Sequence, residues 1–154
     1  MGMKRDLLIL LAMVAALVLL QLAGKAVAPH PPMGMASALL WGKLKETKIS
    51  IDTKTGHYAA AYPQSVKDMA GKPITLSGFL VPIDILPESK HFLLSRRAPT
   101  CPFCSPGEPN EIIDVQLESP ASWLDSFVTV TGTFGLMDDA ELGMFFQLSN
   151  ARKE

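Results

Sequence analysis

The pattern that most restricts the fold is an alternation of apolar and small polar residues that begins at Ile74. β-branched and aromatic residues at a period of two, separated by Gly, Pro and Asp turns, are typical of strands. The pattern predicts five strands, over residues 74–83, 92–94, 111–117, 127–134 and 144–148. The chain is therefore predicted to be all β from Ile74 onward.

Two of the predicted strands repeat one another. Ile74–Leu80 and Val128–Phe134 both read apolar, Thr, apolar, hydroxyl and glycine, which places Gly78 and Gly132 at equivalent positions. A glycine in the middle of a strand often marks a bend or bulge that lets a small barrel curl. The sequence therefore predicts a mainly β fold, a small, partly open barrel of five to six strands of the OB type. A two-layer sandwich is the alternative.

The N-terminus carries a different kind of apolar segment. Lys4 and Arg5 precede Leu7–Ala23, a run that is apolar except for Gln21. A basic start before such a run is typical of a secretory signal or an N-terminal membrane anchor. The run makes roughly 26 Å of helix, close to the ~30 Å hydrocarbon core and longer than the core of an ordinary cleaved signal. We therefore expect an inner-membrane anchor, with the residues from about 29 onward in the bacterial periplasm.

The chain divides into three predicted parts. These are a signal peptide or membrane anchor (1–28), a Pro/Met-rich tether with a short helix (29–47) and the β-barrel domain (48–154). The Leu and Trp residues of the short helix, over residues 36–44, are expected to pack on the domain or on the membrane surface. The part after residue 28 holds 11 basic and 14 acidic side chains, a net charge of −3. This balance does not favour a nucleic acid as partner, because a phosphate backbone requires a basic surface.

The only two cysteines, Cys101 and Cys104, lie in a Cys-Pro-Phe-Cys sequence between two predicted strands. Their loop, residues 95–110, contains four prolines and one glycine. A long loop with so little conformational freedom is typical of a binding site held by a scaffold. Two cysteines are too few to staple a domain, so the fold must depend on its hydrophobic core.

Three interpretations of the cysteine pair compete. Two thiolates on one turn form half of a Zn or Cu(I) site, for which His91 is the first candidate as a third ligand because it precedes the strand leading into the loop. The other candidate ligands are His57, Glu108, Glu111 and Asp114.

The second interpretation is a thiol–disulfide oxidoreductase, since Cys-Pro-x-Cys also occurs in thioredoxin-like active sites. The Ser-Pro-Gly sequence after Cys104 cannot form the helix that activates the attacking thiol in those proteins. The third interpretation is a structural disulfide between Cys101 and Cys104, formed in an oxidising compartment.

Several segments together resemble one protein family, namely Gly78–Pro82, Phe92–Leu94, Cys101–Pro106, Pro109–Asn110 and Ile112–Val115. The chain resembles, over roughly residues 36–150, a family of exported bacterial proteins catalogued as a domain of unknown function. The resemblance implies a periplasmic, often membrane-tethered protein, sometimes encoded near metal-linked ABC transport systems, and it brings no catalytic activity. Similar sequences often carry a Cys followed closely by a His in this loop, where this chain has Cys104.

The sequence thus predicts an exported accessory protein that binds a soft or borderline metal ion through Cys101 and Cys104, with His91 as a third ligand. Zn and Cu(I) are the candidate ions, and a transport-system protein is the candidate partner. The sequence contains no Ser/His/Asp set, phosphate-binding loop or paired-carboxylate motif, so it gives no case for a hydrolase.

Overall fold

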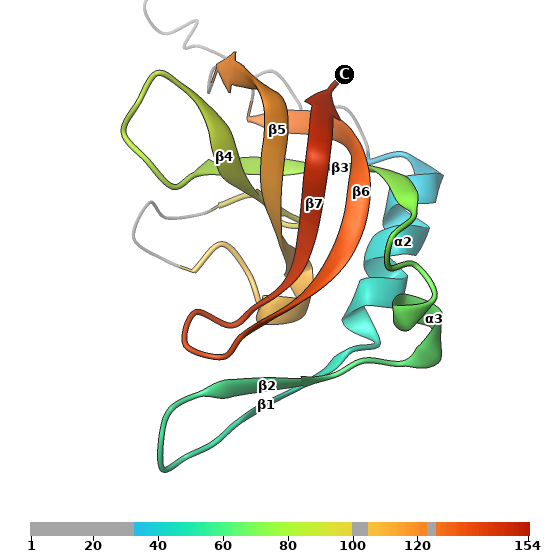
Figure 1. The fold of residues 1–154 in the computed structure, drawn as a ribbon, viewed down its shortest axis with the longest axis vertical. Coiled ribbons are helices and arrows are strands. Elements are labelled where there is room, and N and C mark those ends of the chain that lie inside the picture. Colours follow the sequence, from blue (N-terminus) through green and yellow to red (C-terminus); the bar gives the residue numbers. More distant parts are fainter. Residues whose placement is uncertain (1–32, 100–104, 123–125) are drawn as a thin grey trace, which may run out of the picture. The chain divides into compact units, whose positions relative to one another are not determined.

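The structure is a computed structural model that describes residues 33–99, 105–122 and 126–154 (Figure 1). Its elements are α2 (Met35–Lys45), β1 (Lys48–Ile51), β2 (Tyr58–Ala61), α3 (Gln64–Lys67), β3 (Pro73–Pro82), β4 (Glu88–Ser95), the 3₁₀ turn η1 (Pro109–Glu111), β5 (Ile112–Ser122), β6 (Phe127–Asp139) and β7 (Met144–Lys153). The predicted N-terminal anchor and the two cysteines lie outside the described residues. Within the described part of the chain, no helix is both long enough and apolar enough to cross a membrane.

Five strands form a barrel in the order β3-β4-β5-β7-β6, and β6 pairs with β3 to complete the circuit. Every neighbouring pair is antiparallel except β5 and β7, which are parallel. The β3–β4 ladder is short and joins Phe79–Pro82 to Phe92–Ser95. The predicted mainly β fold is confirmed. The five strands lie within the expected five to six, and their pairing runs around the whole circuit.

Alternate residues of the strands fill the barrel, because successive side chains of a strand point to opposite faces. In β6, for example, Val128 and Val130 are buried while their neighbours along the strand are only partly buried. Burying an aliphatic or aromatic side chain of this kind stabilises the fold by roughly 1.5–3 kcal/mol. Other large, fully buried residues of the strands are Leu76, Phe92, Leu94, Phe134, Phe145, Phe146 and Leu148.

The two strands with the repeated sequence, β3 and β6, lie side by side, with Leu76 opposite Val130. A β-carbon at Gly78 would lie 2.7 Å from the carbonyl oxygen of Ser95, and one at Gly132 would lie 2.9 Å from a side-chain atom of β7. The β6–β7 register also shifts around Gly132. Each glycine thus permits a close approach of strands that a side chain would block, which agrees with their predicted role in curling the barrel.

Helix α2 packs against β3 (Figure 1). The indole N–H of Trp41 donates to the carbonyl oxygen of Ser77 at 2.9 Å, and the hydroxyl of Ser37 accepts from the backbone N–H of Ser77 at 3.0 Å. Trp41 and Leu44 belong to the hydrophobic core. The expectation that this helix packs its Leu/Trp side on the domain is therefore confirmed for these two residues.

The strands β1 and β2 form a separate two-stranded hairpin. The backbone N–H of Tyr58 donates to the carbonyl oxygen of Ala140, in the turn between β6 and β7, at 2.8 Å. The hydroxyl of Tyr62 donates to the carbonyl oxygen of Met137 at 2.6 Å. These contacts attach the hairpin to the barrel at the β6–β7 end (Figure 1).

Candidate functional site

Ser95 joins the two ends of the cysteine loop. Its fully buried hydroxyl accepts from the backbone N–H of Arg97 at 3.1 Å, and its single proton has two carbonyl acceptors in reach, Pro106 at 2.7 Å and Arg97 at 2.9 Å. The two limbs of the loop are thereby held together where they leave β4 and approach β5. Cys101 and Cys104 are carried between these two fixed points of the chain.

A buried carboxylate lies beside this junction. Glu111 is fully buried, and its Oε1 accepts hydrogen bonds from Lys45 at 2.8 Å and Arg96 at 2.9 Å. The Nε of Arg97 lies 2.9 Å from the Oε2 of Glu111. Because the backbone N–H of Arg96 also donates to the carbonyl oxygen of Glu111 at 3.0 Å, main chain and side chains fix the same junction.

The surroundings of Glu111 determine its protonation. Burial on its own would raise the pKa of this carboxyl, but the hydrogen bonds from Lys45 and Arg96 and the charge of Arg97 lower the pKa below its ordinary value of 4.5. The carboxylate is therefore ionised at neutral pH, and its lone pairs face cations of the protein itself.

His91 forms a second polar cluster, on β4 and β5. Its Nε2 is hydrogen-bonded to the Oδ1 of Asp114, and the donor of this bond is set by the tautomer of the ring. The Nε2 of Gln116 lies 3.4 Å from the other oxygen of Asp114, and the hydroxyl of Ser89 accepts from the backbone N–H of His91 at 3.1 Å. The ring and the backbone of His91 are thus both held, while 47% of its side chain remains exposed.

The predicted ligands do not gather at one point. Among the described residues, no group of three His, Cys, Asp or Glu side chains lies close enough together to hold a metal ion. His57 lies in the exposed turn of the hairpin, Glu108 is exposed, and Glu111 is engaged by three cations. His91 and Asp114 are the two candidates that contact one another. The two cysteines lie outside the described residues, so the structure gives no distance from His91 to them.

A groove of about 880 Å³ borders the C-terminal limb of the cysteine loop, at Ser105, Gly107 and Glu108. It is otherwise lined by residues 45–49, Ile51, Tyr58, Pro109, Asn110, Ile112, Leu142 and Gly143. The amide of Asn110 donates to the carbonyl oxygen of Thr47 at 3.1 Å and so ties η1 to the start of the hairpin. The groove therefore places a mixed polar and apolar surface beside the loop.

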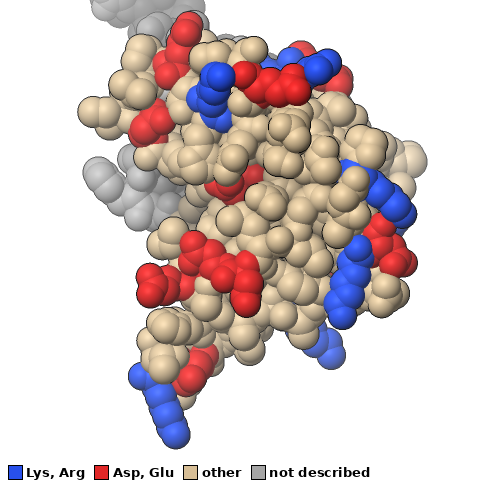
Figure 2. Space-filling model, viewed as in Figure 1, with Lys and Arg blue, Asp and Glu red and all other residues tan. Residues whose placement is uncertain are grey.

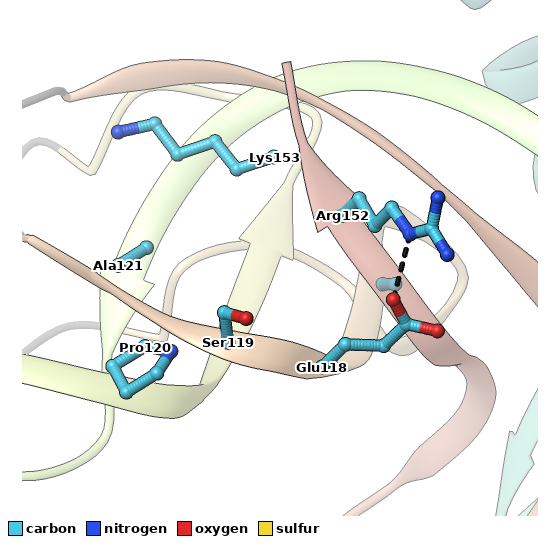
Figure 3. A pocket seen from close by; sticks show the side chains of 7 residues that line it. Glu118, Ser119, Pro120, Ala121, Arg152 and Lys153 are labelled. Atoms are coloured by element: carbon cyan, nitrogen blue, oxygen red, sulfur yellow. Dashed lines mark hydrogen bonds and ion pairs between the residues drawn. The ribbon is translucent and has the colours of Figure 1, made fainter.

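A second hollow, of about 460 Å³, lies at Glu118–Ala121 and Ala151–Lys153 (Figure 3). The Nε of Arg152 lies 2.6 Å from the Oε2 of Glu118, and both side chains are largely exposed. No cysteine or histidine is among the residues that line it. On the face seen in Figure 2, acidic and basic side chains are interspersed, with no continuous basic stretch of the kind that follows a phosphate backbone.

Sequence reasoning missed three residues of this region. Lys45 comes from α2 and reaches Glu111 across 66 positions of the chain, a contact for which the sequence carries no periodic signal. Ser95 is a serine at the end of a strand, and the sequence identifies Asn110 only as a residue of the loop. Each role became visible only when the topology brought these segments together.

The chain matches the family model described as a protein of unknown function (DUF3299) over residues 28–143. A search of curated proteins finds no match to the sequence. Among solved structures, the crystal structure of a DUF3299 family protein from Pseudomonas aeruginosa PAO1 is similar to this chain, with 21% sequence identity and a TM-score of 0.50. The similarity covers 82% of this chain and 89% of the other, and at this identity it concerns the fold alone. The resemblance to a family of unknown function is therefore confirmed, and the chain belongs to the DUF3299 family.

Proposed function

We propose that this chain is an exported periplasmic accessory protein, anchored in the inner membrane, that binds a soft or borderline metal ion through Cys101 and Cys104. Zn²⁺ and Cu(I) are the ions that suit a pair of thiolates three positions apart. The ion would be held and passed on without catalysis. A protein of a transport system is the partner that this role requires.

The observation that carries the proposal is the anchored base of the cysteine loop. Ser95 ties the two limbs together, and Glu111 ties Arg96 and Arg97 to the barrel. A chelating pair on such a loop loses less conformational freedom on binding than a pair on a free segment. A buried charge cluster and a buried hydroxyl thus both hold the base of this loop.

His91 is the proposed third ligand. Histidines that bind metal ions usually donate their second ring nitrogen to a carboxylate or a carbonyl group, which fixes the tautomer and the orientation of the ring. In the tautomer whose Nε2–H donates to Asp114, the Nδ1 is the nitrogen that remains for a ligand bond. The hydrogen bond between His91 and Asp114 therefore supports His91 as a metal ligand.

We propose further that the barrel is of the OB type and that an N-terminal helix precedes it. In chain order, the first barrel strand pairs with the second and the fourth, and the third and fifth are parallel neighbours. This Greek-key order supports the OB assignment. The basic start and the apolar run of residues 7–23 support the helix.

Thiol–disulfide exchange is the second candidate function, since Arg96 and Arg97 bring positive charge near the loop and positive charge favours a thiolate. Both guanidinium groups contact Glu111, which offsets part of their field. This is why metal binding is preferred. The third candidate is a structural or interaction module in which Cys101 and Cys104 close a small disulfide ring.

Metal titration of the purified, reduced protein tests the proposal. Competition with a chromophoric chelator should give one Zn²⁺ or one Cu(I) per chain. The Cys101→Ser, Cys104→Ser double variant should lose this binding, and His91→Gln should weaken it. His57→Gln is the matched control, because His57 is an exposed histidine of the hairpin turn and should leave the affinity unchanged.

Absence of stoichiometric uptake of both ions would overturn the metal proposal. The same preparation then separates the other two candidates through the pKa of the Cys101 thiol. A value near the ordinary ~8.5 would exclude the oxidoreductase. The structural module would remain, for which the double variant should behave as the wild type apart from a small loss of stability.

A further inference from the structure

The outer face of α2 is apolar although it is exposed. Residues 33–42 contain no charged side chain, and within α2 the exposed positions of this stretch are Met35, Ala36, Ala38, Leu39 and Gly42. The helix is therefore apolar on the side that faces solvent as well as on the side that packs on the barrel. A helix of this kind is typical of a segment that is covered on both sides.

The orientation of the helix is fixed, so this face cannot turn inward. Ser37 and Trp41 hydrogen-bond to Ser77, which holds the opposite side of α2 against β3. As a result, Met35 is 81% exposed and Leu39 is 65% exposed, one turn apart on the same side. Two large apolar side chains held in water in this way mark an interaction surface rather than a loosely packed helix.

The chain before the helix limits what can cover this face. Met33 already packs against the hydrophobic core. Only ten peptide steps separate it from Ala23, the last residue of the apolar run, and they span at most about 35 Å when fully extended. That length is roughly the diameter of a domain of this size. A domain tethered so closely lies permanently at the membrane surface, and α2 is the first element after the tether.

We propose that the outer face of α2, from Met35 to Gly42, rests in the interface of the membrane to which the chain is anchored. The proposal relies on the proposed N-terminal anchor and adds an orientation for the domain. Met35 and Leu39 would enter the boundary between headgroups and acyl chains, as the apolar face of an interfacial helix does. Lys43, exposed in the last turn of α2, would meet anionic headgroups.

Methionine methyl NMR of the full chain in lipid nanodiscs tests this proposal. The protein is labelled at methionine methyl groups and placed in phosphatidylethanolamine/phosphatidylglycerol discs, with and without a lipid that carries a nitroxide on its acyl chain. The Met35 signal is expected to fall to roughly half or less with the nitroxide, because its methyl group is near the acyl chains. The signal of Met144, at the start of β7, should keep its intensity and serves as the reference within the same molecule.

A pair of variants sharpens the result. Leu39→Glu should restore the Met35 signal, because a carboxylate on this face opposes entry into the interface. Leu142→Glu is the matched control, since Leu142 is 75% exposed in the β6–β7 turn and should leave the loss at Met35 unchanged. An unaltered signal from the core residue Met69 verifies that each variant is folded.

Met13, in the apolar run, separates the failure of the docking from the failure of the anchor. A reduced Met13 signal with an unaltered Met35 signal would leave the anchor in place and overturn the docking of α2. Unaltered signals at both positions would overturn the anchor and the docking together. If the Met35 signal is unchanged by the nitroxide but shifts with protein concentration, the outer face of α2 binds a second copy of the chain. This result would also overturn the proposal.

Discussion

Two buried carboxylates at the start of β5 are put to different uses. Glu111 and Asp114 are three residues apart, and the sequence offered both as metal ligands. Glu111 is surrounded by Lys45, Arg96 and Arg97. Asp114 instead contacts the Nε2 of the half-exposed His91 and lies 3.4 Å from the side-chain amide of Gln116. Glu111 is therefore paired with cations of the fold. Asp114 orients His91, whose second ring nitrogen is the proposed ligand atom.

The difference shows that burial and charge alone do not identify a ligand. A buried carboxylate that is paired with three cations of the fold serves as their counter-ion, and removing it would leave those cations uncompensated. A carboxylate that orients a histidine acts through it, as an outer-shell residue does in metal sites. Glu111 is thus assigned to the stability of the loop base, and Asp114 to the proposed binding role.

The largest expected effect comes from removing the charge of Glu111. Glu111→Gln should lower the free energy of unfolding by about 2–4 kcal/mol, because it leaves three cations together without their shared counter-ion. Denaturant unfolding at pH 7 measures this loss. Glu108→Gln, an exposed neighbour in the same loop, should stay within about 0.5 kcal/mol of the wild type. Equal effects of the two variants would remove the structural role of Glu111.

The second effect is on metal affinity, and it is expected for Asp114. Asp114→Asn should weaken metal binding roughly 10–100-fold, because the amide no longer fixes the tautomer and orientation of His91. Chelator competition measures the affinity, with the exposed Asp138→Asn as control. An affinity equal to that of the wild type would contradict the role given to His91 and Asp114.

Much of the barrel could be predicted, because a strand that is buried on one face must alternate in polarity. All five predicted barrel strands are present, at the expected places. Their ends could not be predicted: β4 begins at Glu88, within a polar stretch, and β7 continues to Lys153, past Asn150 with its positive φ of 49°. At these ends the strands are extended by pairing with neighbours distant in sequence, which local composition does not record.

The candidate site was less predictable than the barrel, for a physical reason. The spacing of Cys101 and Cys104 is a local signal, and so is the proline content of their loop. The partners that hold the loop are not local. Glu111 meets Lys45 from α2, and Asp114 meets His91 across the β4–β5 ladder. Such pairs depend on strand order and register, and a single sequence contains neither.

The third effect concerns the junction of the loop limbs. Ser95→Ala should lower the free energy of unfolding by about 1 kcal/mol, since the backbone groups of Arg97 and Pro106 lose their shared hydroxyl. Ser105→Ala removes a hydroxyl from an exposed position of the same loop and should have a smaller effect. A larger loss for Ser105→Ala would show that the junction lies elsewhere.

The smallest effect is a dependence on pH. The pKa of Glu111 is lowered in the folded state, so its contribution to stability is present above its ordinary value of 4.5 and is lost as the pH falls through the lowered pKa. The difference in unfolding free energy between wild type and Glu111→Gln should therefore shrink below about pH 4.5. Thermal unfolding at a series of pH values follows it. A difference that persists at low pH would mean that the variant acts through packing.

The central claim is that Cys101 and Cys104 hold a metal ion. Intact mass, under native and denaturing conditions, of the exported protein isolated from the membrane fraction without added reductant or chelator measures this directly. The expected result is one metal ion per chain in the native spectrum and two free thiols in the denatured one. A mass two protons lower with no bound metal would contradict it, because the pair would then be a closed disulfide.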